Sequence, residues 1–272
     1  MVKFYHVKDQ TGVTKMRYYV VADVHGFYSE LVEALTEKGF FADTGEKRLV
    51  VLGDLFDRGH EAEALQDFAI KTAQKGELIY IRGNHEDLMT KLVDTLDLYG
   101  GSDIRYSHHM TNGTLGTLRQ LARVNIAQLD YEPERVRMRM MNTPYFKRLL
   151  PITVDYLETD NYVFVHGWIP CKEIKVNAQD RFYTPINDWR GGDWARARWL
   201  NGMDAHACGV KAEGKTVVCG HVTASYGHSV FEGKGELYGD NADYSPYRAD
   251  GIIALDACTA ASKKINCLVI ED

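Results

Sequence analysis

Five clusters of acidic, amide and imidazole side chains occur along the chain, each directly after a short apolar run. In order, they are Asp23-Val24-His25-Gly26, Gly53-Asp54-Leu55-Phe56-Asp57-Arg58-Gly59, Arg82-Gly83-Asn84-His85-Glu86, His166-Gly167-Trp168 and Gly220-His221. Asp, Asn and His side chains supply the oxygen and nitrogen atoms that divalent metals take as ligands. A carboxylate such as Asp54 has two oxygens and can bridge two ions. One Asp-x-His pair would say little, but five such clusters in order indicate metal chemistry.

The apolar runs before the clusters predict the strands that position them. These runs are Tyr18–Ala22, Leu49–Leu52, Leu78–Ile81, Val163–Val165 and Val217–Cys219. In open α/β sheets, ligands bind just beyond the carboxyl ends of the strands. We therefore expect the five clusters to converge on one place, with the neighbouring glycines allowing tight turns and close backbone approach.

Helical patterns alternate with the first strands. Ser29–Lys38, Glu61–Lys75 and Glu86–Leu98 have helical spacing, which together with the strands predicts an α/β fold with a parallel sheet covered by helices. Later strands are expected at Ile152–Tyr156, Tyr162–Val165, Thr216–Cys219, Gly251–Leu255 and Ile265–Ile270, and they suggest a second sheet facing the first. The opening residues predict a hairpin of Val2–Val7 with Met16–Ala22.

The segment Asp94–Leu150 differs from the rest, because it is polar, helix-prone and rich in Arg and Met. It predicts either an amphipathic helical insertion packed on the sheet or a lid that recruits substrate. We expect residues 1–272 to form a single domain, with this helical insertion at about 94–150.

Composition and net charge limit the partners and the cellular location that we expect for this chain. The chain has 272 residues and a formal net charge of −6, which disfavours nucleic acid and anionic membranes as partners. No apolar run approaches the roughly 18 residues that span a bilayer, and residues 1–7 do not resemble a signal peptide. The five cysteines are odd in number and form no CxxC pair, so we expect reduced cysteines in a cytoplasmic protein.

Taken together, the five clusters resemble the motif series of the calcineurin-like metallophosphoesterases. Asp57-Arg58-Gly59 and Arg82-Gly83-Asn84-His85-Glu86 resemble in particular the phosphoprotein phosphatase branch, which includes serine/threonine phosphatases and related bacterial and phage enzymes. The resemblance implies a four-layer αββα sandwich with two mixed sheets face to face, helices outside and the metals at one edge.

The resemblance also implies two divalent metal ions, with manganese expected and iron or zinc also suited to the ligands. One ion would be held by Asp23, His25 and a bridging Asp54, and the other by Asp54, Asn84, His166 and His221. A hydroxide bridging the ions would attack phosphorus in line.

The remaining roles implied by the resemblance concern the phosphate and the leaving group. Arg58 and Arg82 would grip the phosphate oxygens, His85 would protonate the leaving oxygen as general acid, and Asp57 would orient the His85 ring. Structural readings stay open, since both arginines could be ion-pair partners and Asp57 could cap a helix.

Two positions depart from the relatives. Thr223 stands where many relatives outside the phosphoprotein phosphatase branch carry a second histidine, which argues against the cyclic-nucleotide and broad phosphodiesterases. Trp168 follows His166-Gly167 where a glycine is often found, so the local pocket shape is open.

Three aromatic segments have no assigned place. Trp189–Trp199 could be core or a wall of the substrate cleft, and Tyr244 and Tyr247 could lie beside the site. His108-His109, in the insertion, could touch substrate but are expected to be surface or core residues.

The first functional hypothesis is a metal-dependent phosphomonoesterase of the serine/threonine phosphatase type, acting on a phosphorylated protein or a small phosphoester. The alternative is a hydrolase of dinucleoside polyphosphates, such as diadenosine tetraphosphate, or of other small nucleotides. A non-catalytic scaffold is the third reading, and retention of every ligand and of His85 argues against it. The oligomeric state is left open.

Overall fold

The computed structural model describes residues 15–96, 107–175 and 181–272. One sheet contains, in spatial order, β11 (Cys267–Glu271), β1 (Arg17–Val21), β2 (Lys47–Leu52) and β3 (Leu78–Ile81). The second contains β4 (Leu157–Glu158), β5 (Tyr162–Phe164), β8 (Thr216–Cys219), β10 (Ile252–Ala254) and β9 (Tyr247–Ala249). Strands β11, β4 and β9 run antiparallel to their neighbours and the other pairs are parallel, so both sheets are mixed.

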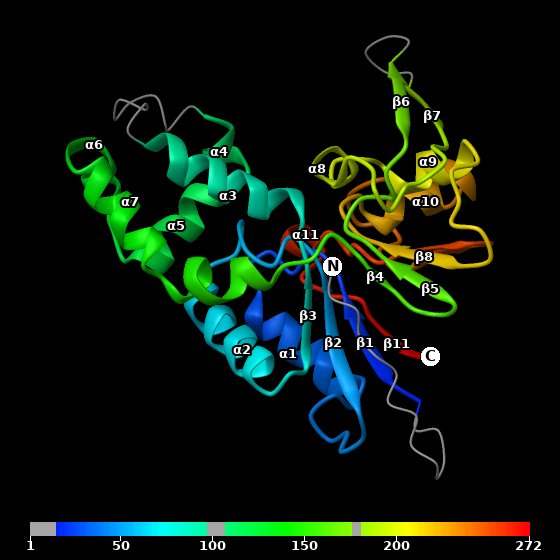
Figure 1. Ribbon diagram of the computed structural model, residues 1–272, viewed down its shortest axis with the longest axis horizontal. Helices are drawn as coiled ribbons and strands as arrows, with labels where there is room; N and C mark the ends of the chain where they lie inside the picture. The colour runs from blue at the N-terminus through cyan, green and yellow to red at the C-terminus, as the bar shows by residue number, and fades with distance from the viewer. Residues whose placement is uncertain (1–14, 97–106, 176–180) are drawn as a thin grey trace.

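Helices cover the outer faces of the two sheets (Figure 1). The first sheet is covered by α1 (Tyr28–Glu37), α2 (Ala62–Gln74) and α3 (Asn84–Thr95), and the second by α8 (Trp194–Ala197), α9 (Gly202–Ala207) and α10 (Ala224–Phe231). A short helix, α11 (Thr259–Ser262), follows β10. The expected four-layer αββα sandwich is therefore confirmed.

Successive side chains on the central strands face the other sheet and the helices in turn, which explains the four layers. On β1 and β2, Val20 and Val50 face the other sheet, while Val21 and Val51 face the helices, and all four side chains are buried. Strands that are apolar on both faces are typical of a parallel sheet covered on both sides. Phe164, on β5, packs into the apolar layer between the two sheets.

The segment expected to be an insertion is helical where the structure describes it. It contains α4 (His108–Thr111), α5 (Thr114–Ala122), α6 (Ile126–Tyr131) and α7 (Pro133–Met141), then a π-helical turn at Tyr145–Leu149 and a 3₁₀ turn at Leu150–Ile152. Helix α5 packs against α2, α3 and α7. The helices therefore extend the first half of the molecule, and the single-domain boundary of 1–272 stays a prediction.

Two predictions about strands are wrong, and a third cannot be compared with the structure. The expected hairpin involves Val2–Val7, which lies outside the described residues; among those residues, β1 pairs with β11 and β2. Ile152–Tyr156 is no continuous strand, because it begins in a 3₁₀ turn and makes only an isolated bridge from Val154 to Ile81. The last expected strand, Ile265–Ile270, corresponds to β11. It belongs to the first sheet rather than the second, because it pairs antiparallel with β1.

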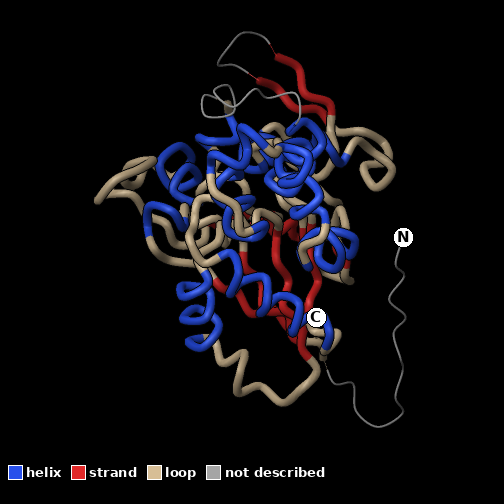
Figure 2. Tube along the Cα trace, turned by 90° about the vertical axis from the view of Figure 1, so that its left-hand side faces the viewer, coloured by secondary structure: helices blue, strands red, loops and turns tan. Residues whose placement is uncertain are grey.

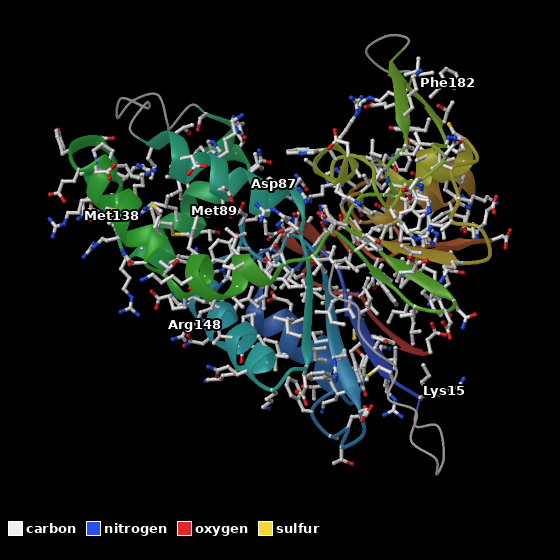
Figure 3. The ribbon with its side chains drawn as sticks, viewed as in Figure 1. Lys15, Asp87, Met89, Met138, Arg148 and Phe182 are labelled. Carbon is white, nitrogen blue, oxygen red and sulfur yellow. The ribbon has the colours of Figure 1, made fainter. Side chains whose placement is uncertain are left out.

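A hairpin that sequence reasoning did not identify projects from the second half of the chain. Strands β6 (Lys172–Lys175) and β7 (Arg181–Thr184) pair antiparallel, and Figure 2 shows them extending away from the sheets. Phe182, labelled in Figure 3, is 55% exposed on this hairpin.

We expect Phe164→Ala to lower the free energy of unfolding by about 3–5 kcal/mol, because it removes a fully buried ring from the layer that joins the sheets. Phe182→Ala is the matched control and should change it by about 0.5 kcal/mol or less. Urea denaturation of both variants measures this. Equal losses would contradict the proposed packing.

Candidate metal centre and active site

The carboxyl ends of six parallel strands meet at one edge of the sandwich, three from each sheet. After β1, β2 and β3 come Asp23, His25, Asp54, Asn84 and His85; after β5, β8 and β10 come His166, His221 and Asp256. All of these side chains are buried except that of His221, which is half-buried. The five clusters thus converge as expected, and Asp256 adds a sixth.

Asp54 is at the centre of the group. Its Oδ2 lies 3.9 Å from His25 Nε2 and 3.8 Å from His85 Nε2, and its Oδ1 lies 3.4 Å from His166 Nε2. Two sets of side chains could each hold a metal ion, namely His25, Asp54 and His85, and Asp54, His166 and His221. Asp54 belongs to both sets, which is the placement that a bridging ligand needs.

Hydrogen bonds to backbone carbonyls orient the histidines. His25 Nδ1 donates to the Phe56 carbonyl at 3.1 Å and His166 Nδ1 donates to that of Leu52 at 2.7 Å. Because a carbonyl can only accept, Nδ1 carries a proton in both rings, and the Nε2 of His25 keeps its lone pair toward the centre. Burial lowers the pKa of His25 and of His221 to about 3, so both are neutral, as metal ligands must be.

Carboxylates gather around this centre. Burial, Asp256 and Asp54 raise the pKa of Asp23, and burial raises the pKa of Asp256 to about 6. Asp23 Oδ2 accepts the His221 backbone N–H at 2.9 Å. Buried like charges of this kind are unfavourable unless a cation compensates them, so the site fits a pair of divalent ions.

The backbone at the site is strained. Among the described residues, nine other than glycine have positive φ, and six of them lie here: Asp23, His25, Asp54, Asp57, Arg58 and His221. Such conformations cost energy and persist only where the surroundings enforce them. The strain indicates that the chain is held in place to present these side chains.

Glu86 is one of the supports, and sequence reasoning assigned it no role. Its buried carboxylate accepts the backbone N–H groups of Asp54, Leu55 and Gly83 and the hydroxyl of Tyr80. The bond from the Gly83 N–H to Glu86 is one half of a helix capping box, and Gly83, which has no side chain, cannot form the other half. Burial and the nearby Asp54 raise the pKa of Glu86.

His85 lies between the metal-binding group and a second carboxylate. Its Nδ1 donates to Asp57 Oδ2 at 2.7 Å, and its Nε2 lies 3.5 Å from Arg58 Nη2. Burial lowers the pKa of His85, but Asp54 and Asp57 outweigh burial and raise it to about 9. Asp54 and Asp57 thus favour the protonated form of His85, whose Nε2 faces the centre. A protonated imidazole has no lone pair for a metal, so His25 and Asp54 are the expected ligands of the set that includes His85.

The guanidinium of Arg82 forms an ion pair with Asp87. Its Nε donates to Asp87 Oδ1 at 2.6 Å, and Arg198 donates to the other oxygen of Asp87 at 2.7 Å. Asp87, labelled in Figure 3, thus pairs with two guanidiniums. The phosphate-binding role of Arg82 stays a prediction, and Arg198 is a half-buried arginine that the sequence did not single out.

The aromatic segments divide between core and site. Trp168 and Trp194 are buried in the core of the second half, whereas Trp199 is 48% exposed with its ring edge-to-face to His221. Tyr247 also packs in that core rather than beside the site. Tyr238 is exposed, and partial burial together with Cys258 and Asp256 raises its pKa.

The sequence profile of the calcineurin-like phosphoesterases matches residues 16–254. The chain belongs to this family. The match covers all six strands whose carboxyl ends contribute to the centre, and it stops at Ala254, two residues before Asp256.

Curated relatives that are named for a specific activity align with only a short part of this chain. The asymmetrical bis(5'-nucleosyl)-tetraphosphatases PrpE of Bacillus velezensis and Bacillus subtilis are each 33% identical over 76 residues, which are 26% of this chain and 30% and 31% of those proteins. The chain thus aligns with under a third of the curated relatives' length. A mutant cold-active protein tyrosine phosphatase has a similar fold, with a TM-score of 0.51 and 18% identity, over 95% of this chain and 77% of that one.

We expect Asp54→Asn to reduce the number of Mn²⁺ ions retained per chain more than His25→Asn does, because only Asp54 belongs to both sets. Metal analysis after gel filtration measures the stoichiometry without requiring activity. Asp204→Asn, at a half-buried carboxylate on α9, is the control. Two ions retained by Asp54→Asn would contradict the bridging position.

Proposed function

We propose that this member of the calcineurin-like phosphoesterases is a metal-dependent phosphomonoesterase of the serine/threonine phosphatase type. Phosphorylated proteins or small phosphoesters would be its substrates. The observation that carries the proposal is the placement of His85, which is hydrogen-bonded to Asp57 and lies beside both Arg58 and Asp54. This arrangement offers a proton and a phosphate-binding cation at the same place.

The metal ligands proposed are those named from the sequence. Asp23, His25 and Asp54 would hold one ion, and Asp54, Asn84, His166 and His221 the other. Two divalent ions there, manganese by preference and otherwise iron or zinc, would supply an activated water and neutralise charge on the phosphate. Asn84 Oδ1 lies 2.7 Å from His166 Nε2, so the two atoms that we propose as metal ligands are adjacent.

The remaining residues act on the phosphate and the leaving group. Arg58 would bind phosphate oxygens through its guanidinium, which matches their geometry with paired donors. His85 Nε2 would give its proton to the leaving oxygen, and Asp57 would hold the ring through Nδ1. Arg82 would reach the phosphate only by loosening its bond to Asp87.

Hydrolysis of dinucleoside polyphosphates is the second candidate. The similarity to the Bacillus tetraphosphatases favours it. Exposed Trp199 and Tyr238 near the site offer flat faces on which a base could stack. Both functions use the same metal ligands, and either one excludes a non-catalytic scaffold.

We also propose a cytoplasmic location. None of the five cysteines, all of them described, forms a disulfide. In the part of the chain that the structure describes, no helix has the length and apolarity to cross a membrane.

We expect His85→Asn to lower kcat by about 10²–10⁴ for alkyl phosphates, the usual range for loss of a general acid. The loss should be smaller for aryl phosphates, because good leaving groups need little protonation. Steady-state kinetics with both substrate types measures this, with His206→Asn as control. Equal losses for both types would contradict the acid role.

Direct competition separates the two substrate classes. With one preparation and one metal, kcat/KM for a phosphoserine or phosphothreonine peptide should exceed that for diadenosine tetraphosphate. A nucleotide preference of about tenfold, which corresponds to about 1.4 kcal/mol of transition-state binding, would favour the second candidate. It would leave the metal ligands unchanged.

A further inference from the structure

One face of helix α5 lies against the loop that carries Asp57 and Arg58. Thr114, Thr117 and Gln120 occur at three-residue intervals, which places them on the same side of the helix. Thr114 and Thr117 are fully buried. All three side chains make hydrogen bonds to the segment from Asp57 to Ala62, although they lie about 60 residues away in sequence.

Thr114 contacts the catalytic pair directly. Its Oγ1 donates to Asp57 Oδ2 at 2.9 Å, and the same oxygen accepts from His85 Nδ1 at 2.7 Å. The other oxygen of Asp57 is buried and has no hydrogen-bond partner among the described residues. The orientation of the carboxylate therefore depends on the two bonds to Oδ2, one from His85 and one from Thr114.

The same helix also holds the backbone of this loop. Thr117 Oγ1 accepts the Asp57 N–H at 2.9 Å, so Asp57 is bound by α5 at its main chain as well as its side chain. Gln120 accepts the Ala62 N–H at 3.0 Å and donates to the Gly59 carbonyl at 3.1 Å. Since Asp57 and Arg58 have φ of 77° and 64°, these bonds maintain a backbone conformation that the loop would otherwise leave.

Gly113 permits this close approach. A Cβ at Gly113 would lie 2.2 Å from the Arg58 backbone nitrogen, and its φ of 82° is one that side chains rarely adopt. The start of α5 therefore packs directly on the backbone of the residue proposed to bind phosphate.

We propose that Thr114 is a positioning residue of the phosphoesterase site, which acts through Asp57 to hold the His85 ring toward the leaving group. The inference rests on the proposed function, because it requires His85 to be the general acid. The inference also gives the helical insertion a supporting role, because α5 stabilises the Asp57–Arg58 loop through hydrogen bonds rather than acting as a lid.

The test begins with Thr114→Val, which keeps the shape of the side chain and removes its hydroxyl. We expect kcat for alkyl phosphates to fall about tenfold, less than the full loss of a general acid, with KM changed less than about twofold. The loss should be smaller for aryl phosphates. Thr114→Ser keeps the hydroxyl and should restore most of kcat. Thr72→Val removes another buried hydroxyl, on α2, which bonds only to the Phe68 carbonyl, and should leave kcat unchanged.

A double-mutant cycle separates positioning from general destabilisation. In a His85→Asn background, Thr114→Val should cause little further loss, because its effect passes through His85. Additive losses, or a Thr114→Ser variant as impaired as Thr114→Val, would overturn the inference. If Thr114→Val does not fold, Thr114→Ala takes its place in the same cycle.

The two proposals fail in different ways. If His85→Asn shows no loss that depends on the leaving group, the general-acid role fails and the inference fails with it. If His85→Asn behaves as expected but Thr114→Val still adds its full loss, only the inference about Thr114 is overturned.

Discussion

The burial of Asp23, Asp54 and Asp256 close together is the constraint on which the rest of the structure depends. Removing several carboxylates from water costs several kcal/mol per charge unless cations or hydrogen bonds compensate it. The structure supplies part of this compensation from the backbone. Asp23 accepts an N–H from His221, and Asp54 accepts the His85 N–H at the start of α3, where the helix dipole favours negative charge. The neutral His25 and His221 add no positive charge, so divalent cations are the natural remaining partner.

The strained loops follow from this constraint. To place six polar clusters around one centre, the chain must turn sharply as it leaves each strand, and it does so through positive φ at residues such as Asp23 and Asp54. Close backbone approach leaves no room for side chains at several glycines. A Cβ at Gly220 would lie 2.2 Å from Asp23 Oδ2, and one at Gly83 would lie 2.2 Å from Asp54 Oδ1. Glu86 and helix α5 stabilise these turns through hydrogen bonds to their backbone.

The central strands and the convergence of the clusters could be predicted from sequence, because both follow from apolar runs that end in polar residues. The same rule applies to Asp256, which follows the apolar run Gly251–Leu255. The roles of Thr114 and Arg198 could not be predicted, since they depend on contacts with Asp57 and Asp87 that only tertiary packing creates. The pairing of β11 with β1 is likewise a long-range contact with no local signal, and it is why the last strand was wrongly expected in the second sheet.

Anomalous diffraction from crystals grown with Mn²⁺ tests the central claim most directly. The account predicts two anomalous peaks about 3.5–4 Å apart, the usual separation in two-metal sites, with Asp54 in contact with both. His25 should lie at one peak, and His166 and His221 at the other. A single peak away from Asp54, or no bound manganese at this edge of the sandwich, would contradict the account.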